Sequence, residues 1–273
     1  MNESLVPIVS IVVPCYNQAM YLGDALDSVL NQTFNLWECI IVNDGSTDDT
    51  QKIALQYCNK DRRFSYVEQH NAGLSAARNI GIKYSKGQYI LPLDSDDKIA
   101  PEYLFKAVSC FEKDNNLAIV YCRAAFWGKR RGEWLLPPYS LERMLGQNCI
   151  FCSALYRKSV FDEIGGYNVN MKYGYEDWDF WLSIIERGGN VYRIDDILFY
   201  YRIRKKSMAR SLDKNKMLYL RRKIWENHRE LYANTFWDIT ESFEYCLVAQ
   251  SLEYKVGCVI MKPIRLLYNL IYK

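Results

Sequence analysis

Short apolar segments alternate with segments of helical periodicity over the first hundred residues of this chain. Four of the apolar segments have the length and β-branched composition of buried strands: residues 8–13, 39–42, 64–68 and 89–93. The segment after the first of them places Leu22, Ala25 and Leu26 on one helical face. Strand–helix–strand repeats of this length predict parallel strands joined by right-handed crossovers. The alternation therefore predicts an α/β fold with a doubly wound, mainly parallel, Rossmann-like sheet.

Polar residues stand directly after three of these expected strands. Tyr16 and Asn17 follow the first strand, Asp44 follows the second, and the segment Asp94–Asp97 follows the fourth. The carboxyl ends of parallel strands meet at one edge of a sheet, and open α/β sheets bind their ligands there. The sequence therefore predicts a polar ligand site at that edge.

The last of these segments carries three carboxylates, those of Asp94, Asp96 and Asp97. Carboxylates this close to one another cannot all stay ionised without cost, whereas crowded carboxylate oxygens suit Mg²⁺ or Mn²⁺ that also hold substrate phosphates. A polar loop with a helix cap is the alternative, because Asp is common after strands. We expect a divalent-metal site, and the surrounding motifs decide between the two interpretations.

The second half of the chain alternates less regularly. Residues 128–138 have the composition of an exposed hairpin or loop, and a short helix is expected to end at Gly165. A longer helix is expected to begin within Tyr173–Trp181 and to run to Arg187, and the chain is helical beyond Asp213. Further strands are expected at residues 118–122, 150–156, 190–194 and 198–201.

Composition limits the class of protein. The 273 residues are 49% hydrophobic, which is enough for a full core. The formal net charge of +3 is too small to predict binding to nucleic acid, and we expect no such partner. No apolar run approaches the roughly 20 residues that a spanning helix needs, so we do not expect an integral membrane protein.

The cysteines indicate a reducing environment. The 9 cysteines have no regular spacing, and residues 1–7 lack the features of a secretory signal, so we expect a cytoplasmic location. Cys149 and Cys152 form a C-x-x-C pair, which could indicate zinc or redox chemistry. The sequence has no second such pair, and His70 and His228 lie far from it in sequence, so we expect buried structural cysteines.

Five short motifs follow one another along the chain. They are V-P-C-Y-N at 13–17, V-N-D-G-S at 42–46, N-A-G at 71–73 with A-R-N at 77–79, L-D-S-D-D at 93–97, and Y-E-D at 175–177. In this order they resemble the motifs of family-2 glycosyltransferases with the GT-A fold. The resemblance implies a glycosyltransferase domain over residues 1–211, with a nucleotide-sugar-binding half at 1–117 and an acceptor-binding half at 118–211. A helical C-terminal extension, residues 212–273, lies outside it.

The resemblance implies inverting transfer of a hexosyl or N-acetylhexosaminyl group. The donor would be a nucleotide-diphosphate sugar, usually UDP-linked, and the acceptor a hydroxyl of a glycan or a lipid-linked glycan. Such enzymes serve the synthesis of surface polysaccharide or lipopolysaccharide.

The resemblance also implies roles for the donor-site residues. Pro14, Tyr16 and Asn17 match the loop beside uracil and ribose, and Asp44 matches the carboxylate that accepts a bond from the base N–H. Arg78 matches a position near the base or the phosphates. The alternatives are that Asn17 only caps a helix and that Arg78 only forms a structural salt bridge with Asp44 or Asp94.

In the acidic segment, the resemblance assigns Asp94 to the ribose or the metal and Asp96 to the metal, and leaves Asp97 open. The cofactor would be Mn²⁺ or Mg²⁺, which neutralises the pyrophosphate as it leaves. A basic run, made of Arg202, Arg204, Lys205, Lys206 and Arg210, lies where related enzymes have a loop that closes over the pyrophosphate, and no histidine lies near Arg204. The resemblance therefore implies that the positively charged side chain of Arg204 binds the pyrophosphate in place of a histidine-bound metal. The alternative is a basic loop that is only exposed to solvent.

Glu176 and Asp177 could each act as the general base, and the resemblance implies that the base is Asp177. The acceptor hydroxyl must lose its proton as it attacks the anomeric carbon, and a carboxylate on the far side of the sugar can accept that proton. Glu176 and Trp178 are expected to contact the acceptor or the pyrophosphate. The alternative is that acidic residues in the first turn of a helix only interact favourably with its dipole.

The C-terminal residues 256–273 carry apolar residues at helical intervals with basic residues beside them. They could contact the inner face of a membrane peripherally or pack on the catalytic domain, and Pro263 interrupts the pattern. Two other functions stay open: a sugar-phosphate nucleotidyltransferase and a non-catalytic nucleotide-sugar or glycan-binding protein. The first would need a glycine-rich basic loop, which residues 14–17 do not form, and intact Asp96 and Asp177 disfavour the second.

Overall fold

The computed structural model describes residues 6–204, 212–236 and 242–271. The chain divides into two compact units: Met1–Pro138 with Cys149–His228, and Tyr139–Asn148 with Arg229–Lys273. The expected division of the chain at residue 211 stays a prediction.

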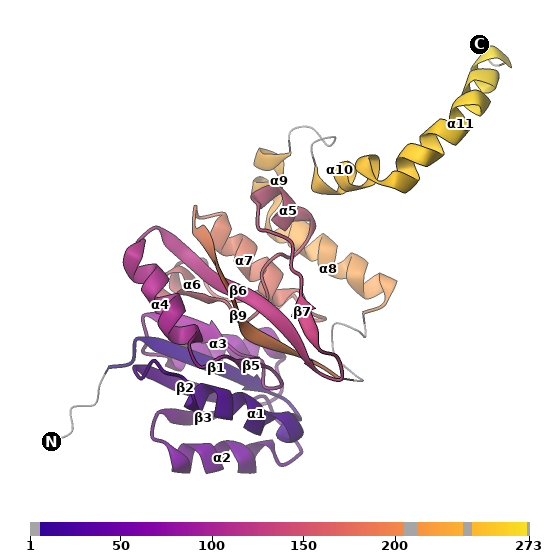
Figure 1. The fold of residues 1–273 in the computed structure, drawn as a ribbon. Helices are drawn as coiled ribbons and strands as arrows, with labels where there is room; N and C mark the ends of the chain where they lie inside the picture. Colours follow the sequence, from indigo (N-terminus) through magenta and orange to yellow (C-terminus); the bar gives the residue numbers. More distant parts are fainter. Residues whose placement is uncertain (1–5, 205–211, 237–241, 272–273) are drawn as a thin grey trace. The chain divides into compact units, whose positions relative to one another are not determined.

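The first unit is built on one sheet of nine strands among the described residues (Figure 1). The strands are β1 (Val9–Cys15), β2 (Trp37–Asn43), β3 (Phe64–Glu68), β4 (Tyr89–Pro92), β5 (Lys98–Ile99), β6 (Leu117–Gly128), β7 (Gly132–Trp134), β8 (Leu155–Arg157) and β9 (Asn190–Ile203). Their order is β3-β2-β1-β4-β8-β6-β9-β5, and β7 pairs with β6 at the side.

Helices connect the strands of the first unit. They are α1 (Ala19–Leu30), α2 (Thr50–Lys60), α3 (Leu74–Tyr84), α4 (Tyr103–Lys113), α6 (Lys158–Ile164), α7 (Glu176–Ile185) and α8 (Lys214–Asn227). Helix α3 packs on β1 and β2, while α4 packs on β6 and β9. Helix α8 belongs to this unit, and its Leu220 and Ile224 are buried.

The expected fold class is confirmed. Strand β1 is buried along its whole length, as its apolar sequence predicts, and it pairs in parallel with both β2 and β4. Strand β3 continues the parallel arrangement on the far side of β2. The carboxyl ends of β1, β2 and β4 therefore lie at one edge of the sheet.

Two strand predictions were wrong in extent. Of the segment 150–156, only its end is in a strand, β8, which runs antiparallel to β4 and β6. The two short strands expected at 190–194 and 198–201 are one continuous strand, β9, paired in parallel with β6. A register shift between Cys122 and Arg123 of β6, which pair with Ile194 and Ile197, accommodates the two residues Asp195 and Asp196 within this long pairing.

Helix α7 is held in place by a buried carboxylate. Asp179 is fully buried, and it accepts hydrogen bonds from the side-chain amides of Asn168 (2.6 Å) and Asn227 (2.6 Å). His228 Nε2 lies 3.3 Å from the same carboxylate, and its Nδ1 lies 3.2 Å from Glu186. The network joins α7 to the end of α8 and so fixes the helix that carries the expected base.

The second unit consists of α5 (Leu141–Gly146), α9 (Arg229–Thr235), α10 (Phe243–Gln250) and α11 (Leu252–Ile271). The hydroxyl of Tyr232 donates to the Leu145 carbonyl at 2.6 Å and joins α9 to α5. Helix α11 contains Pro263, and its described apolar side chains are exposed. None of the described helices is long and apolar enough to cross a membrane.

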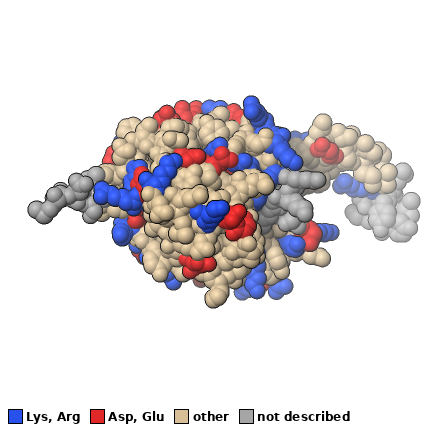
Figure 2. All heavy atoms as spheres, turned by 90° about the horizontal axis from the view of Figure 1, so that it is seen from below, with Lys and Arg blue, Asp and Glu red and all other residues tan. Residues whose placement is uncertain are grey.

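Charged side chains of both signs are interspersed on the face of the molecule that Figure 2 draws. Lys and Arg do not gather into one extended basic surface among the described residues of that face. This distribution agrees with the small net charge of +3.

The close approach of α3 to the sheet gives a test of the packing. A Cβ added at Gly81 would overlap Val12 Cγ1 and lie 2.9 Å from Val42 Cγ2. We expect Gly81→Ala to lower the free energy of unfolding by about 1–3 kcal/mol, because overpacking outweighs the gain in helix propensity. The free energy of unfolding is measured by urea denaturation, with circular dichroism as the signal.

Gly23 of α1 provides the matched control. Its added Cβ would meet only the Tyr57 hydroxyl, at 3.6 Å, an ordinary contact. Gly23→Ala should therefore raise the free energy of unfolding by roughly 0.5–1 kcal/mol. Equal stabilisation by both substitutions would contradict the close packing of α3.

Candidate active site

The loops after β1 and β2 are tied together by Asn17. Its backbone adopts a left-handed conformation, with φ of 53°, and its side-chain oxygen accepts a hydrogen bond from the Thr47 N–H at 2.8 Å. Its own N–H donates to Ser46 Oγ at 2.9 Å. The suggestion that Asn17 caps α1 was wrong, since the residue before that helix is Gln18.

A carboxylate shared between two helix starts explains the difference. Asp48 accepts the N–H of Ala19 (3.0 Å) at the start of α1 and the N–H of Thr50 (3.0 Å) at the start of α2. Ser46 and Thr47, which the sequence also allows as caps of this helix, lie in the loop before it, and the residue directly before α2 is Asp49. Sequence reasoning missed Asp48 because its α1 contact lies 29 residues away.

Asp44 lies directly after β2 and organises the loop before α3. It is 3% exposed, and its carboxylate accepts hydrogen bonds from Gln69 Nε2 (2.6 Å), the Ala72 N–H (2.8 Å) and the Gly73 N–H (2.9 Å). The motif that carries Asn71 is thereby joined to the motif that carries Asp44. Recognition of a base by Asp44 stays a prediction.

Arg78 is the centre of a buried ion-pair network. Its side chain is fully buried, and its Nη2 donates to Asp94 Oδ1 at 2.7 Å while its Nη1 donates to Glu176 Oε1 at 2.6 Å. Of the two salt bridges considered from the sequence, the one with Asp94 is present in the structure. The network joins α3, the loop after β4 and α7, which are far apart in the sequence.

The acidic loop is held against the end of β9 by two arginines. Arg202 donates its backbone N–H to Asp97 Oδ1 (2.8 Å), its Nε to the Asp96 carbonyl (2.7 Å) and its Nη2 to Asp24 (2.6 Å). Arg204 Nε lies 2.9 Å from Asp96 Oδ2, and its Nη1 donates to Gln18 at 2.9 Å. Arg204 thus lies at the acidic loop, next to the start of α1.

Crowding of the carboxylates has the expected electrostatic effect. Burial and the neighbouring charge of Asp94 raise the pKa of Asp96. Burial and the charges of Asp96 and Asp94 raise the pKa of Asp97 well above its ordinary value. A cation bound here would relieve both effects, because it favours the ionised carboxylates.

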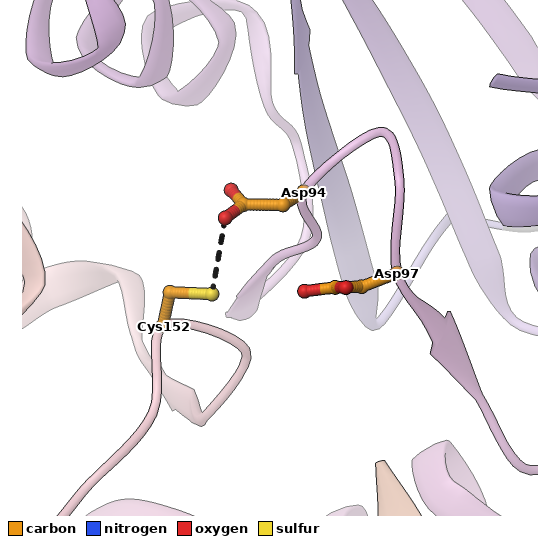
Figure 3. A group of neighbouring side chains, drawn as sticks. All are labelled: Asp94, Asp97 and Cys152. Carbon is orange, nitrogen blue, oxygen red and sulfur yellow. Dashed lines mark hydrogen bonds between the residues drawn. The ribbon is translucent and has the colours of Figure 1, made fainter. Parts of the chain in front are cut away.

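The residues best placed to hold a metal ion differ in part from those expected. One carboxylate oxygen each from Asp94 and Asp97, with Cys152 Sγ, lie within 4.8 Å of one another (Figure 3). Asp97 Oδ2 is buried and has no hydrogen-bond partner among the described residues, so a cation would satisfy it. Asp96 is paired with Arg204 instead, and its role as a metal ligand stays a prediction.

Asp177 lies in the first turn of α7, beside Glu176. The turn is entered through Tyr175, whose backbone is left-handed with φ of 61°. Burial and the charge of Glu176 raise the pKa of Asp177 to about 7. A carboxyl group with this pKa can exchange a proton near neutral pH, which suits a general base.

The remaining expected site residues differ in exposure. Pro14 is buried in β1, whereas Tyr16 is 49% exposed at the edge of the sheet. Trp178 is 3% exposed and packs against the ring of Tyr175, and Trp181 is fully buried in the core. Contact of Trp178 with an acceptor stays a prediction.

Sequence reasoning missed two residues of this region. Cys152 was correctly expected to be buried. Nothing in the sequence around it indicates that it lies beside Asp94 of the acidic loop, which is 58 residues away. Arg202 was grouped with a basic run, and nothing in the sequence indicated that its backbone binds Asp97. The expected basic residues Lys205, Lys206 and Arg210 lie outside the described residues.

Comparison with known sequences shows the family. The profile of glycosyl transferase family 2 matches residues 10–165, more than half of the chain. The chain is 31% identical over 244 residues to TuaG of Bacillus subtilis, a protein named as a teichuronic acid biosynthesis glycosyltransferase, with 87% of this chain and 93% of TuaG covered. It is 35% identical over 209 residues to an uncharacterized glycosyltransferase of Rickettsia prowazekii, covering 72% of this chain and 64% of that protein. The chain thus spans less than two thirds of some relatives.

Two solved structures share the fold. Residues 1–349 of S. aureus TarS, in complex with UDP-GlcNAc, match with a TM-score of 0.66 and 20% identity, over 90% of this chain and 77% of that chain. The mannosyltransferase PcManGT of Pyrobaculum calidifontis, in complex with GDP-Man and Mn²⁺, matches with a TM-score of 0.60 and 17% identity, over 96% and 81%. These likenesses confirm the expected GT-A fold.

The family match and the relatives agree with the five motifs identified in the sequence. The five motifs that suggested the resemblance meet in one region around Asp44, Arg78 and Asp94. The chain belongs to glycosyl transferase family 2.

Proposed function

We propose that this protein is an inverting glycosyltransferase that moves a sugar from a UDP-linked donor to a hydroxyl of a glycan or lipid-linked acceptor. The observation that carries the proposal is the Asp94–Arg78–Glu176 network, which brings the acidic loop and Asp177 to the same edge of the sheet. A nucleotide site and a base near neutral pKa are what such a transfer requires.

The donor would bind at the carboxyl edge of the parallel strands. Tyr16 is exposed there and can lie against a base, while Asp44 keeps the 71–73 loop in place and presents its carboxylate nearby. TarS with UDP-GlcNAc and PcManGT with GDP-Man support a nucleotide-sugar donor for this fold. We infer UDP because Pro14, Tyr16 and Asn17 match the uracil loop of the family's motifs.

The acidic loop would hold Mn²⁺ or Mg²⁺ beside the pyrophosphate. Asp94 and Asp97 fit the ion, since no described residue binds the buried Asp97 Oδ2 and the crowded carboxylates favour positive charge. A bound divalent ion would supply Lewis-acid stabilisation of the leaving diphosphate. Arg204, held at this loop through Asp96, would add a second positive charge near the same phosphates.

Asp177 would accept the proton of the attacking hydroxyl. Its carboxyl group has a pKa of about 7 because it is removed from water and lies next to Glu176. The Arg78 pair fixes Glu176, and the Asp179 network fixes the rest of the helix, so the position of Asp177 is defined from both sides. Positioning of this kind lowers the entropic cost of proton transfer.

The acceptor is inferred to be a growing surface polysaccharide or a lipid-linked precursor. TuaG is named for teichuronic acid biosynthesis, and it matches most of this chain. A peripheral membrane contact would suit such an acceptor. Helix α11 exposes Val256, Val259, Ile260 and Ile264, the i, i+3, i+4 and i+8 positions of one helical face, with the basic residues Lys255, Lys262 and Arg265 near them.

The pH dependence of transfer tests the base. Asp177 must be deprotonated to accept a proton, so kcat/KM should rise tenfold per pH unit below about 7 and level off above it. Asp177→Asn should bind the donor normally and lose roughly 10²–10⁴-fold in kcat. The measurement is nucleotide release from pH 5 to pH 9, a range chosen as about two units on either side of that pKa.

Asp162→Asn is the matched control, because Asp162 is an exposed carboxylate of α6 whose ion pair, in the part of the chain that the structure describes, is with Lys158. It should keep the wild-type rate and pH profile. Near-normal turnover by Asp177→Asn would move the base to another residue, and donor binding without turnover in the wild type would favour a non-catalytic binding protein.

Calorimetry tests the metal. UDP should bind the wild-type protein more tightly in Mn²⁺ than in EDTA by roughly 10- to 100-fold, the equivalent of one or two charge-assisted contacts. Asp97→Asn should remove most of that difference, and Asp162→Asn should leave it unchanged. Equal UDP affinity with and without the ion would count against a metal at this loop.

Vesicle flotation tests the membrane contact. The full chain should float with vesicles that contain anionic phosphatidylserine, and Ile260→Asp should reduce the floating fraction by placing a charge on the apolar side of α11. Val169→Asp, an equally exposed valine position in the first unit, is the control. An unchanged floating fraction for Ile260→Asp would rule out α11 as the contact.

A further inference from the structure

A thiol lies beside the carboxylates of the acidic loop. Cys152 is buried just before β8, and its Sγ lies 3.5 Å from Asp94 Oδ2 (Figure 3). The loop that carries Cys152 approaches the acidic loop because β8 pairs with β4 and β6. A sulfur atom therefore stands next to a cluster whose expected ligands are oxygen atoms alone.

Each carboxylate of this cluster has one oxygen already used by the protein. Arg78 binds Asp94 Oδ1, which leaves Asp94 Oδ2 facing Cys152 Sγ. The Arg202 N–H binds Asp97 Oδ1, which leaves the buried Asp97 Oδ2 without a hydrogen-bond partner among the described residues. The protein thus fixes the orientation of both side chains and leaves one oxygen of each to a ligand.

Asp96 is engaged differently. Its Oδ2 lies 2.9 Å from Arg204 Nε, and Arg204 is anchored in turn on Gln18. Positive charge already compensates this carboxylate. The uncompensated oxygens and the sulfur therefore belong to Asp94, Asp97 and Cys152, whose ligand atoms lie within 4.8 Å of one another.

We propose that Cys152 is a ligand of the divalent ion, together with Asp94 and Asp97. The inference deepens the proposed function, on which it rests for the ion's place beside the donor. A sulfur ligand raises affinity for Zn²⁺ and Co²⁺ much more than for Mg²⁺, because soft ligands favour these ions. On binding, the thiol releases its proton to the buffer and the thiolate coordinates the ion. The site would accept Mn²⁺ and be sensitive to competing Zn²⁺.

The plainer account is that the thiol only donates a weak hydrogen bond to Asp94 and stays protonated when an ion binds. The two accounts differ in one observable. A thiolate bound to Co²⁺ gives a charge-transfer absorption in the near ultraviolet, whereas carboxylate and water ligands do not. This signal comes from the bound ion and needs no turnover.

The test is a titration of the full-length protein with Co²⁺ alone, followed by absorption and calorimetry. The wild type should develop the thiolate band as Co²⁺ binds. Cys152→Ser should bind Co²⁺ without the band and should lose roughly 10- to 100-fold in Zn²⁺ affinity, with little change for Mg²⁺. Cys149→Ser, which changes a buried cysteine outside the cluster, should keep the band.

The outcomes separate this proposal from the proposed function. Binding of Co²⁺ to the wild type without the band, or a band that persists in Cys152→Ser, would overturn the role of Cys152. Nucleotide release in Mn²⁺ by the same preparation would then leave the glycosyltransferase proposal intact. A thiolate band in a protein that turns over no nucleotide sugar would uphold the metal site and count against the transferase. If Cys152→Ser does not fold, Cys152→Ala is titrated in its place, because the wild-type band alone does not identify the cysteine that binds Co²⁺.

Discussion

The buried guanidinium of Arg78 is the interaction on which the rest of the site depends. It holds Asp94 on one side and Glu176 on the other, with both distances below 3 Å and no exposure of its own side chain. Removing one member of a buried pair leaves an uncompensated charge and costs about 3–5 kcal/mol. Since Asp94 begins the acidic loop and Glu176 precedes Asp177, the pair that stabilises the fold also sets the distance between the proposed metal site and the proposed base.

The arginines around the acidic loop compensate only part of the negative charge of its three carboxylates. Arg78 and Arg204 neutralise Asp94 and Asp96, and the Arg202 backbone supports Asp97. These contacts fix the positions of the three carboxylates, while burial and the charges of Asp96 and Asp94 raise the pKa of Asp97. A site prepared in this way gains the most from a ligand that brings its own positive charge.

The sequence was sufficient for the first half of the fold and less so for the second. Strands such as Val9–Cys15 are buried on both faces, so composition alone marks them, and their parallel order follows from the crossover rule. The motif order also indicated which polar residues gather at the sheet edge. Local sequence could not reveal Cys152, Arg202 or the single strand β9, because antiparallel pairing with β4 and the long pairing with β6 are decided by tertiary contacts.

The carboxyl edge of the parallel strands is the proposed site of sugar transfer from a nucleotide donor. The most direct measurement is incubation of the full-length protein with a panel of UDP-, GDP- and dTDP-sugars in Mn²⁺, with the products identified by mass spectrometry. The protein should consume a UDP-sugar and release UDP, and the sugar should be transferred to an acceptor or to water. Two results would contradict this function. One is the formation of a sugar phosphate and a nucleoside triphosphate when pyrophosphate is added, and the other is a protein that neither binds nor consumes any of the donors.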